Sequence, residues 1–288
     1  MKPAPFIYHN PVSPEEAVSL LASNEEAKIL AGGQSLVPML NMRFVVPEHV
    51  IDLNNVIGIV GITDSDNLLE IGAMTRQCDL MSNDLVKVKA PIIPEALEYV
   101  GHFQTRNRGT IGGSLCHLDP AAELPCLMAA YDAVLTAQGP DGQRIIPFIE
   151  WPQAYMIPNL AADELLTKIS FRCWSLDHGY GFVEFARRHG DFAIVAVAAL
   201  LEVEDGKISR AAISVGGADI RPVRLVNAEE ELIGMLANED TYKVAADMAQ
   251  EIECMSDAYI TSQYRQRLAG TLVQRALIKA GDRANRSY

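Results

Sequence analysis

The sequence predicts an α+β fold, in which two N-terminal α/β subdomains precede a C-terminal domain built from an antiparallel sheet and helices. Three observations lead to this prediction. The chain begins with a strand, a helix, a strand and a glycine-rich turn, which is the pattern of a small α/β unit. A hairpin and several short helices follow. The last third then changes from apolar strands to helical periodicity, and 288 residues suffice for two or three compact units.

The first subdomain is expected to end near the pair Asn54-Asn55. Ser13 is a suitable N-cap and Pro14 fits a first helical turn, so a helix should start there. The apolar segment after this helix leads into a glycine turn, and Pro38 in the next apolar segment indicates a helical first turn or a kink. The expected strands are 6–11, 28–31 and 45–53, and the expected helical segments are 14–24 and 36–42.

The middle region should contain hairpins, because apolar segments flank the turn-forming residues 64–67 and 139–142. Helices are expected where apolar residues recur at helical spacing, as they do after Pro94. Residues 104–109 are polar and are expected to form a loop. The expected strands are 57–62, 68–73, 134–137, 143–146 and 165–171, and the expected helices are 77–85, 94–100 and 127–131.

The C-terminal region should begin as an antiparallel sheet and end as helices. Asp205-Gly206 is a tight-turn sequence between two strands. From Ala228 onward, apolar residues follow a helical period. Gly281 is expected to end the last helix, since glycine is frequent just beyond helix ends. The expected strands are 182–187, 193–203 and 211–215, and the expected helices are 229–236, 242–253 and 264–280.

The overall charge limits the kinds of partner. The chain has 24 Lys and Arg against 37 Asp and Glu, a formal net charge of −13. Because nucleic-acid binding needs a basic surface, nucleic acid is not expected as a partner. The longest apolar run, 192–203, is too short to span a bilayer, and the N-terminus leads into no hydrophobic signal region. A cytoplasmic protein without an integral membrane segment is therefore expected.

The cysteines and histidines give no sign of a metal site. The five cysteines include no pair with the spacing of a zinc ribbon or an iron–sulfur motif. The six histidines are scattered, and none is paired at helical metal-ligand spacing with an acidic third ligand. A Gly-X-Ser-X-Gly nucleophile elbow is also absent from the sequence. We therefore predict no metal ligand and no catalytic residue.

Two glycine clusters are the strongest candidates for ligand binding: Ala31-Gly32-Gly33-Gln34-Ser35 and Thr110-Ile111-Gly112-Gly113-Ser114. Paired glycines permit positive φ angles and a close ligand approach, and consecutive N–H groups in such turns can form a nest for an anion. Each cluster alone is better explained as an ordinary tight turn. For the pair, two interpretations are equally well supported: ordinary tight turns, or a joint site for the two phosphates of one dinucleotide. Because the chain is acidic, backbone N–H groups and hydroxyls would make most of the hydrogen bonds to these phosphates.

Further side chains that could contact a ligand lie near or beyond the second cluster. His117 either contacts a ligand or makes a structural hydrogen bond. Glu123 either accepts hydrogen bonds from ligand hydroxyls or is an exposed, solvated carboxylate. The charged stretch 187–192 is first interpreted as a turn at a strand end, with a cleft-lining role as the alternative. Cys116 is expected to be a buried, inert thiol.

Taken together, these motifs resemble those of the FAD-binding middle subunit of the molybdenum hydroxylases. This family includes the medium subunit of carbon monoxide dehydrogenase and the flavin domain of xanthine dehydrogenase. The motifs occur in the family's order, and the similarity extends over about 6–280. The matching stretches are 31–35, 51–53, 71–73, 106–114, 119–120 with 123–125, and 187–188 with 190–193.

The resemblance implies the PCMH-type FAD-binding fold, with units at 1–55, 56–177 and 178–288. FAD would lie extended between the first two units, with its diphosphate at the glycine clusters. Glu123, where the family often has Asp, would face the ribityl or nearby hydroxyls, and 188–192 would lie towards the isoalloxazine. The implied cofactor-binding residues are Ala31, Gly32, Gly33, Gln34, Ser35, Leu36, Thr110, Ile111, Gly112, Gly113, Ser114, His117, Glu123, Arg188, Asp191 and Phe192.

The implied activity is electron transfer. A small partner subunit would carry two [2Fe–2S] clusters, a large one would carry a molybdenum–pterin cofactor, and the assembly would be a dimer of heterotrimers. Electrons would reach the FAD of this chain and leave to an external acceptor. Two other hypotheses stay open: a stand-alone FAD-dependent oxidase or reductase with its own small substrate, and a non-catalytic scaffold that has lost its cofactor. The sequence identifies neither the substrate of the complex nor the acceptor.

Overall fold

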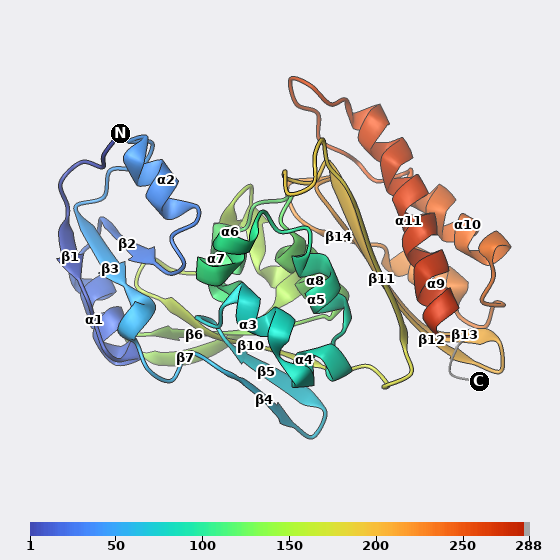
Figure 1. The fold of residues 1–288 in the computed structure, drawn as a ribbon, viewed down its shortest axis with the longest axis horizontal. Helices are drawn as coiled ribbons and strands as arrows, with labels where there is room; N and C mark the ends of the chain where they lie inside the picture. The colour runs from blue at the N-terminus through green and yellow to red at the C-terminus, as the bar shows by residue number, and fades with distance from the viewer. Residues whose placement is uncertain (285–288) are drawn as a thin grey trace.

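The fold places three main β-sheets in a row (Figure 1). In the computed structural model, which describes residues 1–284, a blue N-terminal unit, a green middle unit and an orange-to-red C-terminal unit follow one another. Residues 285–288, at the end of the third expected unit, lie outside the described part. The mixture of separate sheets and helices is the α+β architecture that the sequence predicts.

The N-terminal unit is a small parallel sheet backed by a helix. Its elements are β1 (Ile7–His9), α1 (Pro14–Ser23), β2 (Ala27–Leu30), α2 (Leu36–Asn41), β3 (His49–Asp52) and the 3₁₀ turn η1 (Leu53–Asn55), with the strand order β1-β3-β2. Ser13 caps α1 as expected, because its hydroxyl accepts a hydrogen bond from the amide of Glu16 at 3.2 Å. Ala17 and Leu21 of this helix are buried beside Ile51 of β3. The carboxyl end of β2 leads directly into the first glycine cluster.

The middle unit is a five-stranded antiparallel sheet with short helices. Its strands are β4 (Ile62–Ser65), β5 (Leu68–Gly72), β6 (Val134–Gly139), β7 (Gly142–Pro147) and β10 (Leu165–Arg172), in the order β4-β5-β10-β6-β7. Its helices are α3 (Gln77–Ser82), α4 (Asp84–Lys89), α5 (Ile92–Leu97), α6 (Phe103–Arg108), α7 (Ile111–His117) and α8 (Glu123–Ala130). The 3₁₀ turn η2 (Phe148–Glu150) and the strand pair β8 (Pro152–Ala154) and β9 (Ile157–Pro158) precede β10. Leu69, Ile71 and Ile169 from the sheet share one core with Leu124 and Leu127 of α8.

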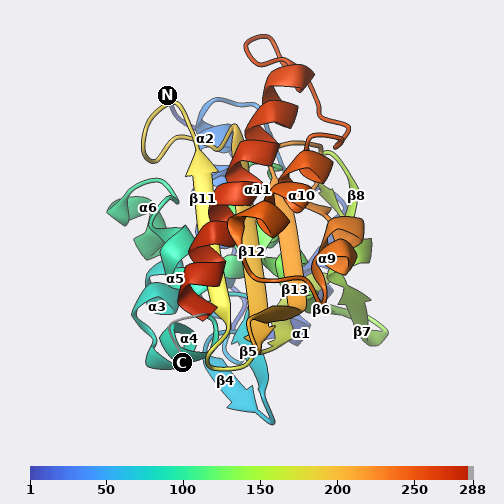
Figure 2. The same ribbon diagram turned by 90° about the vertical axis from the view of Figure 1, so that its right-hand side faces the viewer.

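The C-terminal unit is a four-stranded antiparallel sheet with helices on one face (Figure 2). Its elements are β11 (Gly179–Phe185), β12 (Val195–Glu204), β13 (Lys207–Gly216), β14 (Val223–Arg224), α9 (Val226–Leu232), α10 (Glu239–Ala249) and α11 (Ser262–Ala284). Strand β12 is buried on both faces. Ala196 and Ala198 join the core of the middle unit, whereas Val195 and Val197 join the core beneath α11. The expected turn at Asp205-Gly206 separates β12 from β13.

Glu95 of α5 ties the middle unit to the C-terminal unit. Its carboxylate accepts hydrogen bonds from the Phe182 amide at 2.8 Å and from Arg283 at 2.7 Å, and it lies 2.9 Å from the Lys279 ammonium. Burial acts to raise the pKa of Glu95, but these three donors outweigh it and hold the pKa below its usual value. The ionised carboxylate therefore stabilises the contact between the two units.

Two predictions of secondary structure in the middle unit are wrong. The strand expected at 57–62 does not form, because Gly58 and Gly61 have φ angles of +83° and +117°, and pairing begins only at Ile62. The helix expected at 77–85 is divided, because the Asn83 side chain accepts hydrogen bonds from the amides of Leu85 and Val86 and so starts a new helix.

Two further expectations are wrong at helical segments. Residues 104–109, expected as a loop, lie largely within α6, whose Arg106 donates to the Val100 carbonyl at 2.9 Å. The last helix continues past Gly281 to Ala284. A Cβ at Gly281 would lie 2.0 Å from the Tyr242 hydroxyl, so this glycine permits close packing of α11 on α10. In residues 1–284, none of the helices combines the length and apolar character needed to cross a membrane.

Candidate functional site

The fold brings the two glycine clusters into direct contact. A Cβ built on Gly32 would lie 2.2 Å from the Arg108 carbonyl oxygen, and one on Gly113 would lie 3.4 Å from the Ala31 Cβ. A side chain at Gly32 has no room, so glycine at this position permits the close approach of the N-terminal and middle units. The expected convergence of two segments far apart in sequence is therefore present.

The first cluster is an open turn. Gly33 has a φ angle of +72°, which glycine adopts readily. Within residues 1–284, the amides of Gly32, Gly33, Gln34 and Ser35 donate no hydrogen bond to a protein acceptor. Ser35 is the N-cap of α2, but its side chain makes no capping bond. Four consecutive donors are thus available to a ligand, as expected of an anion nest.

The second cluster is a helix start, and its amides are not free as the hypothesis of a second anion nest requires. Its amides are already used inside the protein: Ile111 donates to the Thr75 carbonyl at 3.1 Å and Gly112 to the Ala73 carbonyl at 2.8 Å. Gly113 donates to the Thr110 hydroxyl at 3.0 Å, and Ser114 donates to the Thr110 carbonyl at 3.1 Å. Because a Cβ on Gly112 would lie 2.6 Å from Ala73, this glycine serves close packing.

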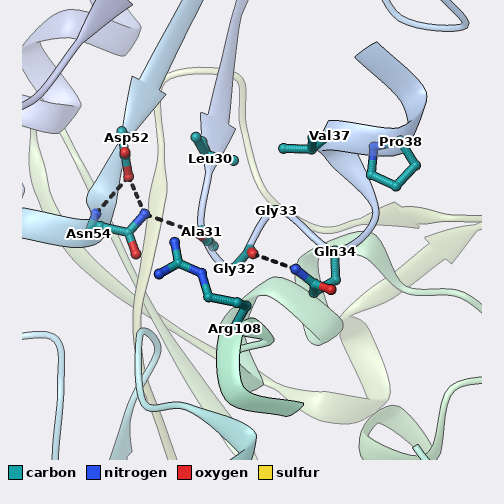
Figure 3. A pocket seen from close by; sticks show the side chains of 10 residues that line it. All are labelled: Leu30, Ala31, Gly32, Gly33, Gln34, Val37, Pro38, Asp52, Asn54 and Arg108. Carbon is teal, nitrogen blue, oxygen red and sulfur yellow. Dashed lines mark hydrogen bonds between the residues drawn. The ribbon is translucent and has the colours of Figure 1, made fainter. Parts of the chain in front are cut away.

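A pocket of about 370 Å³ opens where the first cluster faces the end of α6 (Figure 3). It is lined by Leu30, Ala31, Gly32, Gly33, Gln34, Val37, Pro38, Asp52, Asn54 and Arg108. Asp52 and Asn54 stand at the carboxyl end of β3, next to the glycine turn, so the pocket lies at the carboxyl edge of a parallel sheet, where α/β folds commonly bind ligands.

Asp52, Asn54 and Arg108 are site residues that the sequence prediction missed. Asn54 donates to the Ala31 carbonyl at 3.2 Å, so it holds the glycine turn. The Tyr8 hydroxyl donates to Asp52 at 2.7 Å. Arginines in an otherwise acidic chain, just before the second cluster, were the available signal for Arg108. This signal does not suffice to place Arg108 in a site, because the sequence predicts only a polar loop there.

Glu123 and His117 do not line this pocket. Glu123 is the first residue of α8 and is 8% exposed, so the exposed-carboxylate alternative is wrong. Burial, with a smaller effect of the Asp119 charge, raises the pKa of Glu123 to about 7. Burial also lowers the pKa of His117, against the opposite effect of Asp119. Cys116 is half-buried and not fully buried as expected, and burial raises the pKa of its thiol to about 12.

Arg188, Asp191 and Phe192 lie on the loop between β11 and β12. Asp191 and Phe192 border a second hollow of about 450 Å³, which includes Tyr259 and Arg265 and is separate from the glycine pocket. The loop touches the middle unit, since a Cβ on Gly190 would lie 3.0 Å from the Gly101 carbonyl oxygen. These residues are therefore not gathered with the glycine clusters. In the described part of the chain, His, Cys, Asp and Glu side chains form no group of three or more suited to a metal.

Comparison with known proteins identifies the family. Residues 4–171 match the family described as the FAD binding domain in molybdopterin dehydrogenase, and 180–280 match the CO dehydrogenase flavoprotein C-terminal domain. The chain belongs to the FAD-binding medium subunits of the molybdenum hydroxylases. This confirms the family and the fold class that the motifs indicate.

The similarity to medium subunits extends over nearly the whole chain. The alpha subunit of the 6-hydroxypseudooxynicotine dehydrogenase complex of Paenarthrobacter nicotinovorans is 41% identical, over 99% of this chain and 97% of the relative. The carbon monoxide dehydrogenase medium chain of Afipia carboxidovorans is 34% identical, over 99% of each chain. The structure of quinoline 2-oxidoreductase from Pseudomonas putida 86 superposes with a TM-score of 0.94 at 35% identity, covering 99% of each chain.

Proposed function

We propose that this chain is the FAD-binding, electron-transferring subunit of a multi-subunit molybdenum hydroxylase. The observation that carries this proposal is the open glycine turn of Gly32–Ser35, which lines a pocket in a chain whose full length matches medium subunits. Because charge-assisted hydrogen bonds from backbone N–H groups hold phosphates well, the free amides fit the diphosphate of FAD.

The second cluster would complete the diphosphate site from the other side. With its amides used internally, it offers the hydroxyl of Ser114 and the side-chain-free surface of Gly113, which is partly exposed beside Ala31. Leu36 would pack at the edge of the site from the first turn of α2. A bulky side chain at Gly113 would displace the Thr110 cap, which lies 2.8 Å from its Cβ position.

The remaining contacts extend this placement along the cofactor. Glu123 would face the ribityl or nearby hydroxyls, with His117 at the same end of the site. Arg188–Phe192 would lie towards the isoalloxazine, and the contact of this loop with Gly101 brings it next to the middle unit. The units at 1–55, 56–177 and 178–288 are part of the same proposal, with FAD between the first two.

When bound, FAD would supply the redox chemistry of the subunit, namely the uptake and release of electrons. The protein residues bind and orient the cofactor: amides of the first turn hold the phosphates, and the Arg188–Phe192 loop shields one end. No general base of this chain is required. The chemistry on the substrate would take place on a large molybdenum–pterin subunit, which therefore sets the substrate. A small subunit with two [2Fe–2S] clusters would deliver the electrons.

We place the chain in a dimer of heterotrimers in the cytoplasm. Native mass spectrometry of the complex purified from its source tests the assembly. The expected result is this chain with one FAD, together with a small iron–sulfur subunit and a large molybdenum subunit, in two copies each. A flavin-containing chain that purifies alone and oxidises a small substrate without partners would favour the stand-alone alternative. A chain that binds no FAD after reconstitution would support a scaffold.

A further inference from the structure

Arg108 lines the glycine pocket and Arg76 lies next to it, and neither guanidinium has a carboxylate ion-pair partner in residues 1–284. Arg108 lines the pocket, and within residues 1–284 its side chain makes no ion pair and no hydrogen bond. Arg76 donates to the Arg108 carbonyl and to the Asn54 side-chain oxygen, which are neutral acceptors. Five other arginines form ion pairs with carboxylates in residues 1–284, namely Arg144, Arg210, Arg224, Arg265 and Arg283. Others, such as the exposed Arg172, form none, so it is the position of Arg108 in the pocket that matters. The cationic charge at the pocket is therefore not neutralised by a direct ion pair.

The carboxylate that lines the pocket is that of Asp52. Its carboxylate accepts hydrogen bonds from the Tyr8 hydroxyl and the Asn54 amide, at 2.7 and 2.9 Å, and from the Asn54 side chain. It makes no ion pair with either arginine in the described chain. Burial lowers the pKa of Arg76 and the positive charge of Arg108 lowers it further, and together they outweigh the opposite effects of neighbours that include Asp79 and Asp52. The two cations repel each other, so an anion between or beside them would relieve the repulsion.

The position of Arg108 is fixed by its own backbone. Its carbonyl receives the Arg76 guanidinium, and its carbonyl group packs directly against Gly32. Arg76 reaches across to Asn54, which in turn holds the Ala31 carbonyl. Figure 3 shows the Arg108 guanidinium beside Ala31 and Gly32, on the Asn54 side of the turn. The Arg108 side chain therefore starts next to the glycine turn whose amides are open.

We propose that Arg108 pairs with a phosphate group bound at the first glycine turn, and that Arg76 is the positioning residue that holds Arg108 against this turn. With the proposed function, the ligand is FAD and the group is its diphosphate. The amides then supply directed hydrogen bonds, while Arg108 supplies the only full positive charge in the pocket lining, among the described residues.

Equilibrium titration of the full chain, freed of flavin, tests this proposal. The probes are FAD and riboflavin, which lacks phosphate. Arg108→Ala should weaken FAD binding by about 10- to 100-fold, the usual effect of losing a charged hydrogen bond. It should also flatten the salt dependence of FAD binding and leave riboflavin binding unchanged. Arg172→Ala is the matched control, since Arg172 is exposed at the end of β10 and away from the pocket.

Arg76 is tested by a double-mutant cycle. Arg76→Gln should weaken FAD binding in the parent chain but add little in the Arg108→Ala background, because both changes remove the same charge contact. Additive losses would show that Arg76 is only structural and would overturn its positioning role. An FAD affinity unchanged in Arg108→Ala, or an equal loss for riboflavin, would overturn the role of Arg108. A parent chain that binds no FAD would instead contradict the proposed function.

Discussion

Replacing Gly32 with alanine should separate the two glycine clusters. Gly32 does not have a positive φ angle, so alanine adds no backbone strain and the effect is steric. The new Cβ would lie 2.2 Å from the Arg108 carbonyl oxygen and 2.8 Å from the Gly109 Cα. Such contacts essentially never fall below 3.0 Å, and both neighbours are backbone. The first cluster and the backbone of Arg108 and Gly109, just before the second cluster, must therefore move apart by about the difference between 2.2 and 3.0 Å.

The size of the effect follows from this displacement. Forced overpacking costs about 1–3 kcal/mol of unfolding free energy, and each kcal/mol lowers the Tm by roughly 2–4 °C in a chain of this size. Loss of one charge-assisted hydrogen bond to a phosphate weakens binding by about 10- to 100-fold. We therefore expect Gly32→Ala to reduce both the Tm of the flavin-free chain and its affinity for FAD.

Fluorescence titration with FAD and thermal unfolding of the flavin-free chain measure these two effects separately. Gly206→Ala is the control, because Gly206 has a φ of +75° in the β12–β13 turn and no atom within 4 Å of its Cβ position. This variant should lose about 1–2 kcal/mol through backbone strain and bind FAD normally. If Gly32→Ala also bound FAD normally, contact between the clusters would not matter for the cofactor, and the reasoning would be refuted.

Three further predictions concern stability. Gly281→Ala should destabilise the chain by about 1–3 kcal/mol, although alanine usually stabilises a helix, because its Cβ would lie 2.0 Å from the Tyr242 hydroxyl. Glu95→Ala should cost about 1–3 kcal/mol by leaving the Phe182 amide and two cations without their acceptor. Glu184→Gln should flatten the pH dependence of stability. Burial and the Glu123 charge raise the pKa of Glu184 to about 8 from an ordinary 4.5. The parent chain therefore loses stability as pH rises through this interval, and the Gln variant should not show this loss.

Thermal and denaturant unfolding check all three. A Gly281→Ala chain as stable as the parent would show that α10 and α11 adjust freely. For Glu95, whose pKa is held low, the loss should be present at neutral pH and shrink as pH falls through the lowered pKa, and a loss that persists in acid would contradict the ionic explanation. For Glu184, parallel pH curves of the parent and the Gln variant would mean that its carboxyl does not titrate as described.

Local signals predicted much of the fold. Ser13 before Pro14 and the Asp205-Gly206 turn were identified correctly, because capping and tight turns depend on a few adjacent residues. Helix α6 was missed because it has no buried residue, and contacts such as that of Arg106 with the Val100 carbonyl are not visible in a periodicity pattern. Gly281 does not end α11 as the sequence predicts, because a packing glycine and a terminating glycine are identical in sequence.

The candidate site shows the same difference between local signals, which the sequence reveals, and contacts between distant segments, which it does not. Two glycine clusters signal a ligand, but their different roles depend on which amides remain free. The carbonyls of Ala73 and Thr75, which follow β5, accept hydrogen bonds from the amides of Gly112 and Ile111. No feature of the neighbouring sequence predicts these bonds. The role of Arg108 likewise depends on its backbone lying against Gly32, a contact between distant segments.

The most direct test of the account is a structure of the chain with FAD bound. The account predicts phosphate oxygens within hydrogen-bonding distance of the amides of Gly32–Ser35, with the Arg108 guanidinium beside them and the cofactor extending towards the Arg188–Phe192 loop. A diphosphate bound away from the first glycine turn, with the amides of Gly32–Ser35 still open, would contradict it.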